Sequence, residues 1–179
     1  MSSTSNRRLT APISGLVGAL VALAIAGCGH SGGGPYLSAS WIGTDTGKVA
    51  GSAVASWCPV ANRLEVTAVS QDAGFGVVIY PQADLATGDY PVFDPGIDSV
   101  HRPGASGAVR WFTEQQVKGY QSDSGLVTLT RSGTRVQLRF SLRMSSINGH
   151  DSIRAKGKAT GLALGVCIAD SVPNGSPKQ

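Results

Sequence analysis

One segment in the second half of the chain alternates between apolar and polar residues. Within residues 134–144, every second position from 136 to 142 is apolar, namely Val136, Leu138, Phe140 and Leu142, and cationic or polar side chains stand between them. A period of two is typical of a β-strand with one face on a core and the other face in solvent. The segment therefore predicts an amphipathic strand that belongs to a β-sheet.

Other segments along the chain show strand patterns of the same kind. Residues 63–70 alternate and residues 75–80 form a short apolar run, so the turn-forming stretch between them predicts a β-hairpin. The dipeptide Asn148-Gly149 is a strong turn signal, and it separates residues 134–144 from a second alternating segment at residues 152–160. Two more strands are expected at residues 108–112 and 126–130.

The composition favours one domain made of strands. Of the 179 residues, 41% are hydrophobic and 15% are charged, so the chain can bury a core. Its 24 glycines suit many short strands joined by turns. We expect a single all-β domain over residues 36–170, built as an antiparallel β-sandwich or a small β-barrel, and a disordered tail at residues 171–179.

The N-terminal segment has the pattern of a secretion signal. Arg7 and Arg8 precede an uncharged apolar run at residues 16–26, which is too short to span a bilayer comfortably. The run ends in Ile25-Ala26-Gly27-Cys28, which resembles the lipobox of bacterial lipoproteins. A cleaved secreted protein with a chance cysteine is the competing interpretation.

The lipobox resemblance implies a lipid anchor. Residues 1–27 would be a lipoprotein signal peptide, and Cys28 would become the mature N-terminus carrying palmitate-type acyl chains, which hold a protein firmly at a membrane. Residues 28–35 would be a flexible tether rich in glycine. The resemblance implies that the chain is exported and anchored in the cell envelope. Because Gly29 and not Asp follows the cysteine, it favours the outer membrane where the cell has one.

Two cysteines remain in the expected mature chain. An even pair in an exported chain predicts a disulfide between Cys58 and Cys167, which would tie an early strand to the last one. Neither cysteine stands in a metal-binding spacing, so no metal site is expected. Free thiols or a redox pair are the alternative.

Basic residues concentrate late in the chain. Residues 36–100 contain 2 basic and 7 acidic residues, whereas residues 101–161 contain 10 basic and 3 acidic ones. Six of the cations should share the outer face of two neighbouring strands: Arg135, Arg139, Arg143, Arg154, Lys156 and Lys158. This face is either solvated, or offset by the acidic half of the chain, or a patch for lipid headgroups, lipopolysaccharide or cell-wall polymers. After loss of Arg7 and Arg8 the balance is 13 − 11 = +2, so we expect no nucleic-acid partner.

The sequence offers little that points to catalysis. Residues 93–107 are expected to form a long loop, which holds Asp94, Asp98, Ser99 and His101. No known metal spacing matches them, and catalytic triads are assembled from distant parts of a fold. Segments such as 85–96 resemble small exported β-sandwich lipoproteins of unassigned function, a resemblance that carries over no catalytic residue. We expect that the protein is not an enzyme and that it binds no cofactor.

Two functions compete. In the first, the chain is a membrane-anchored envelope protein whose domain is a non-catalytic binding or structural module, meeting an anionic envelope component or another envelope protein. In the second, the domain carries a small apolar ligand inside a barrel, as calycin-like barrels do. The aromatic residues would then either fill the core or line the ligand cavity: Trp41, Trp57, Trp111, Tyr36, Tyr80, Tyr90 and Tyr120.

Overall fold

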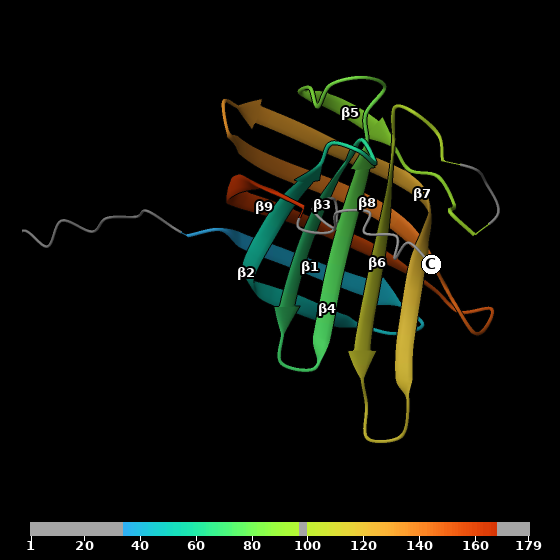
Figure 1. Cartoon of the computed structure of the whole chain (residues 1–179). Helices are drawn as coiled ribbons and strands as arrows, with labels where there is room; N and C mark the ends of the chain where they lie inside the picture. The colour runs from blue at the N-terminus through green and yellow to red at the C-terminus, as the bar shows by residue number, and fades with distance from the viewer. Residues whose placement is uncertain (1–33, 97–99, 168–179) are drawn as a thin grey trace, which may run out of the picture. The chain divides into compact units, whose positions relative to one another are not determined.

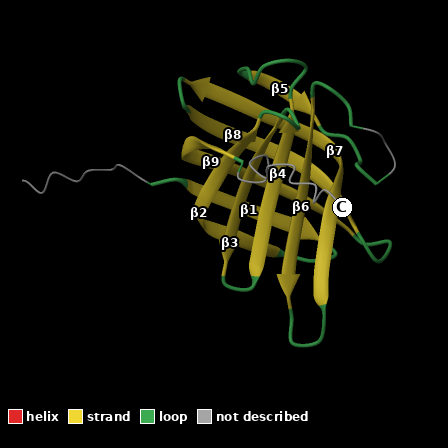
Figure 2. Cartoon of the chain, in the orientation of Figure 1, coloured by secondary structure: helices red, strands yellow, loops and turns green. Residues whose placement is uncertain are grey.

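A computed structural model describes residues 34–96 and 100–167, and these residues form nine strands. The strands are β1 (Tyr36–Gly43), β2 (Gly47–Cys58), β3 (Arg63–Ser70), β4 (Ala73–Tyr80), β5 (Gly88–Pro91), β6 (Gly104–Phe112), β7 (Val117–Ser132), β8 (Arg135–Ser146) and β9 (Ser152–Val166). Figure 2 shows strands and loops only. No helix in this part of the chain is long and apolar enough to cross a membrane.

The strands close into a barrel. Around the ring the order is β7, β6, β4, β3, β2, β1, β9 and β8, and β8 returns to β7 (Figure 1). Neighbours around the ring are antiparallel, and a short parallel contact joins β2 to β9. The ninth strand, β5, pairs with the C-terminal half of β7. The all-β prediction is therefore confirmed, and of its two architectures the structure has the small barrel.

Strand β7 serves two partners along one edge. Its first residues, Val117–Gln121, pair with β6, and its later residues, Leu126–Leu129, pair with β5. The register shifts between Ser122 and Ser124, close to Gly125, whose φ of 134° suits glycine. A Cβ at that position would meet the backbone of Ser141. This irregularity in the pairing of β7 with β8 lies between the part of β7 that pairs with β6 and the part that pairs with β5.

Aromatic side chains pack across the barrel interior. Trp41 of β1 and Trp111 of β6 come from opposite sides of the ring, yet their ring centroids lie 5.2 Å apart. Phe75 and Phe140 stack at 5.0 Å, and Tyr120 stacks on Trp111 at 5.5 Å. The aromatic residues that sequence analysis left between core and cavity thus mostly belong to the core, although Tyr36 is 46% exposed.

The expected loop at residues 93–107 is shorter than predicted. Residues 104–107 belong to β6 and pair with β4, where Gly104 faces Tyr80 and Gly107 faces Val77. A Cβ at Gly107 would lie 2.6 Å from the Leu142 side chain, so the small residue permits close packing there. Sequence analysis assigned residues 104–107 to the loop, and that was wrong.

The predicted strand patterns otherwise hold, and so does the cysteine pairing. Residues 63–70 and 75–80 form the hairpin β3–β4, and Asn148-Gly149 lies in the turn between β8 and β9. A disulfide joins Cys58, at the end of β2, to Cys167, with Cα atoms 4.9 Å apart. The expected signal peptide, Cys28, most of the tether, the tail, Asp98 and Ser99 lie outside the described residues.

Candidate functional site

Six cations define what we call the basic face: Arg135, Arg139, Arg143, Arg154, Lys156 and Lys158. All six are exposed, because the alternation of β8 and β9 turns these positions away from the core. Across the two strands, Arg139 stands directly opposite Lys158, and Arg143 stands opposite Arg154. Like charges at such positions destabilise a sheet. The sequence prediction of a shared cationic face is therefore confirmed in its placement.

Little negative charge approaches this face from the described residues. The single ion pair is between Arg143 Nε and Asp123 Oδ2, at 4.0 Å. Asp123 also accepts hydrogen bonds from Ser124 and Ser145, both at 2.7 Å. Asp89 stands one strand further away and accepts a hydrogen bond from Thr128. Across residues 34–96 and 100–167, the other five cations have no carboxylate within 4.0 Å.

The acidic half of the chain does not neutralise the basic face. Among described residues, one ion pair links the two halves, and it joins Lys118 to Asp45 at a different site. Arg63 pairs with its own neighbour Glu65. The interpretation that the acidic and basic halves of the chain offset each other's charge therefore holds for Lys118. It does not explain what offsets the charge of the basic face.

Three hollows indent the basic face. One, of about 370 Å³, is bordered by Arg143 and Arg154, and the other two share Arg139 and Lys158. The larger of these two, of about 490 Å³ and open to solvent, is lined by Ser38, Ser40, Arg139, Lys156, Gly157 and Lys158. The smaller, of about 120 Å³, is lined by Thr128, Thr130, Gln137, Leu138, Arg139, Lys158 and Thr160. Neither of these two linings includes a carboxylate.

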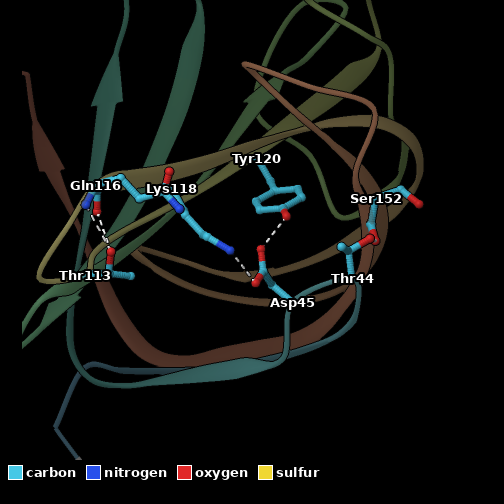
Figure 3. A network of polar contacts seen from close by, with 7 residues as sticks. All are labelled: Thr44, Asp45, Thr113, Gln116, Lys118, Tyr120 and Ser152. Atoms are coloured by element: carbon cyan, nitrogen blue, oxygen red, sulfur yellow. Dashed lines mark hydrogen bonds and ion pairs between the residues drawn. The ribbon is translucent and has the colours of Figure 1, made fainter.

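A second polar cluster surrounds Asp45, in the turn between β1 and β2. Figure 3 shows Lys118 and Tyr120 of β7 pointing at its carboxylate. Lys118 Nζ donates to Oδ1 at 2.7 Å, and the Tyr120 hydroxyl donates to Oδ2 at 2.5 Å. Sequence analysis missed this cluster, because 75 residues separate Asp45 from Tyr120 and no pattern links them.

The contacts of the cluster shift the pKa values of Asp45 and Tyr120 in opposite directions. Hydrogen bonds from Lys118 and then from Tyr120 lower the pKa of Asp45, against a smaller opposing effect of burial. Burial in turn raises the pKa of Tyr120, and the neighbouring Asp45 carboxylate raises it further. Each group in this cluster has its partner within the protein, so we assign the cluster a structural role.

Replacing Asp45 with Asn is expected to lower the free energy of unfolding at pH 7 by about 1.5–3 kcal/mol, as for lost hydrogen bonds to a charged group. A lowered pKa stabilises the fold above the unfolded value near 3.9 and loses that contribution as the pH falls. The difference from wild type should therefore shrink below about pH 4.

Urea unfolding between pH 3 and 8 measures this difference. Asp72→Asn is the matched control, since the Asp72 side chain makes no hydrogen bond to another described residue. Equal losses for both variants would contradict the assigned role. Tyr120→Phe should lose stability at neutral pH, and it should lack the further loss above pH 10 that a raised tyrosine pKa gives the wild type.

Asp94 and His101 of the expected loop, and the two bridged cysteines, make contacts of their own. Asp94 accepts a hydrogen bond from the Gly96 N–H at 2.8 Å, and His101 packs edge-on against Phe93 at 5.6 Å. The liganding atoms of Cys58, Cys167 and Glu65 lie within 4.8 Å of one another. The two sulfur atoms are bonded to each other, so they are not available as metal-binding thiolates.

The function has to be inferred from the residues of this chain, because no protein-family model, curated protein or solved structure matches it. Of the two polar clusters, the Asp45 cluster is satisfied internally and the basic face is not. The basic face is therefore the best candidate for contact with a partner.

Proposed function

We propose that this protein is a lipid-anchored component of a bacterial envelope, in which the barrel acts as a non-catalytic binding module. Its basic face would contact an anionic component of the envelope. The observation that carries the proposal is the Arg139–Lys158 pair, two cations directly opposite each other with no carboxylate within 4.0 Å among the described residues. An anionic partner would offset the repulsion within that pair.

The expected anchor limits where the basic face can reach. Ten residues separate Cys28 from Ser38, so a fully extended tether spans at most about 36 Å. Ser38 lies on the outward face of β1, the strand that borders β9. The basic face would consequently stay close to the membrane that holds the lipid, in a layer where anionic headgroups and polymers are concentrated.

The packed interior gives less support to the alternative of an apolar-ligand carrier. A ligand chamber needs open volume between the strands. The contact of Trp41 with Trp111 and that of Phe75 with Phe140 occupy space inside the barrel. The binding-module proposal needs no such volume, since its site is on the outer surface.

Reversing one charge of the basic face is expected to weaken binding to a polyanion. For Arg139→Glu or Lys156→Glu we expect about tenfold lower affinity for polyphosphate at low salt, with the difference shrinking as salt is added. Affinity is measured by isothermal titration of the full chain, purified in non-ionic detergent. Arg110→Glu is the matched control, because Arg110 is exposed on β6, away from the basic face.

The control variant makes the result specific. It changes the net charge by the same amount as Arg139→Glu, so a loss caused only by overall charge would appear in both. Equal affinities for the wild type and the two basic-face variants would overturn the proposed function. So would wild-type binding to polyphosphate that is no stronger than binding to an uncharged polymer.

A further inference from the structure

We infer that the larger hollow of the basic face holds a phosphate group, as part of a phosphate ester of a polyol. This inference rests on the proposed function and specifies the chemistry of its ligand. The hollow lies between three strands, with Ser38 and Ser40 on β1, Lys156 and Lys158 on β9, and Arg139 on β8.

The strand register brings the polar groups of the hollow together. Ser38 pairs with Lys158, and Ser40 pairs with Lys156 across β1 and β9. Lys156 and Lys158 are two residues apart on one face, which spaces them by about 7 Å along the strand. Arg139 faces Lys158 from the other side. These five residues form one cluster on the outer surface of the sheet.

The floor of the hollow is open because the residues between the two Ser–Lys pairs turn inward. Ala39 and Gly157 stand opposite each other at that level of the sheet. Ala39 is buried. A Cβ added to Gly157 would run into the Phe140 ring and the carbonyl oxygen of Ser38. Glycine at this position therefore lets Phe140 pack beneath the strand, and no side chain fills the outer surface above it.

The donors of the hollow suit phosphate better than carboxylate. An arginine fork, two ammonium groups and two hydroxyls line the hollow, whereas a carboxylate offers only two oxygens with about four lone-pair sites. A phosphate diester, as in a phospholipid headgroup or a poly(glycerol phosphate), carries two non-bridging and two ester oxygens around a tetrahedral centre, so it presents acceptors in more directions than a planar carboxylate. The Ser38 and Ser40 hydroxyls make no side-chain hydrogen bond within the described residues, so both are available to donate.

The smaller hollow indicates what is attached to the phosphate. It continues from Arg139 and Lys158 to the hydroxyls of Thr130 and Thr160 and the Gln137 amide, whereas the third threonine, Thr128, donates its hydroxyl to Asp89. Such a surface matches the hydroxyls of glycerol or a sugar, and it offers little to an acyl chain. Glycerol phosphate is the simplest group with both parts. It can come from a phospholipid headgroup or from a soluble envelope polymer.

The test compares two polyanions of equal charge, polyphosphate and poly-L-glutamate, by titration into the full chain in non-ionic detergent. We expect polyphosphate to bind about tenfold more tightly, because only phosphate oxygens can use the full donor set. Ser38→Ala with Ser40→Ala keeps every charge, and it should reduce polyphosphate affinity about fivefold while leaving poly-L-glutamate affinity unchanged.

Two further variants make the result interpretable. Lys158→Gln removes a charge from both hollows and should weaken polyphosphate binding. Arg135→Gln removes the same charge at a basic-face position outside the hollows and should have a smaller effect. Lys158→Gln also serves if the double serine variant folds poorly.

The outcomes separate the two proposals. Equal binding of both polymers, unaffected by the serine replacements, would overturn the phosphate site and leave the proposed function standing. Binding of neither polymer would overturn the proposed function itself. The source is identified with soluble poly(glycerol phosphate) and with phosphatidylcholine vesicles that contain phosphatidylglycerol. Serine-dependent binding to either probe supports the site, and its absence with both contradicts it.

Discussion

Replacing Cys58 and Cys167 together with alanine is expected to lower the free energy of unfolding by about 4–5 kcal/mol, by restoring the entropy of the unfolded chain. The bridge spans 109 residues of sequence, so its loss frees a long loop in the unfolded state. The melting temperature should fall by more than about 10 °C for a domain of this size.

The folded state should survive the loss of the bridge. The backbone of Cys167 donates a hydrogen bond to the Trp57 carbonyl at 3.0 Å, and β2 pairs with β9 over residues 55–57. These contacts hold the two strand ends together without sulfur. We therefore expect the alanine variant to bind polyphosphate with wild-type affinity at temperatures below its own melting transition.

Thermal and urea unfolding of the oxidised full chain measure the effect. The wild type treated with a reducing agent is the matched control, and its melting temperature should agree with that of the alanine variant. A loss below about 1 kcal/mol, far from the chain-entropy expectation, would mean that the unfolded chain gains little freedom without the bridge.

Local periodicity accounts for the parts of the fold that the sequence could predict. Strands β3, β4, β8 and β9 combine alternation or an apolar run with clear turn residues, and these signals need no knowledge of the rest of the chain. The cysteine pairing was predictable for a different reason, because the two cysteines that remain after the expected signal peptide and anchor have only each other as an intramolecular partner.

Other strands carry weak local signals. In the first half of β7, Tyr120 is the main apolar side chain facing inward, and the next inward position is Ser122. That serine is buried because its Oγ accepts a hydrogen bond from the Gly107 N–H at 2.8 Å. A buried polar residue interrupts the apolar period, and the reason for its burial lies on another strand.

The candidate site likewise has one part that local sequence signals predict and one part that depends on long-range contacts. The six cations were predictable, because the parity of each position along β8 and β9 sets the direction of its side chain. The larger hollow was not, because it depends on the register of β1 against β9. Ser38 pairs with Lys158, 120 residues later in the chain, and no local pattern encodes that distance.

Replacing Phe140 with alanine is expected to lower the free energy of unfolding by about 3–5 kcal/mol, the usual result of truncating a packed core phenylalanine. Its side chain is 5% exposed, stacks on Phe75 and covers Gly157. Leu126→Ala is the matched control on the neighbouring strand, where the leucine is 41% exposed. It should change stability by no more than about 0.5 kcal/mol.

The same pair of variants also tests whether the barrel is a carrier. A packed interior has no free volume to absorb the truncation, so the full cost should appear in urea unfolding. If Phe140→Ala instead lowered the free energy of unfolding by no more than Leu126→Ala, the interior would be loosely filled. The open volume that the carrier alternative requires would then be present. Phe140 also lies beneath Gly157, which lines the larger hollow. A large loss of unfolding free energy would therefore indicate that the side chain beneath this hollow is part of the tightly packed core.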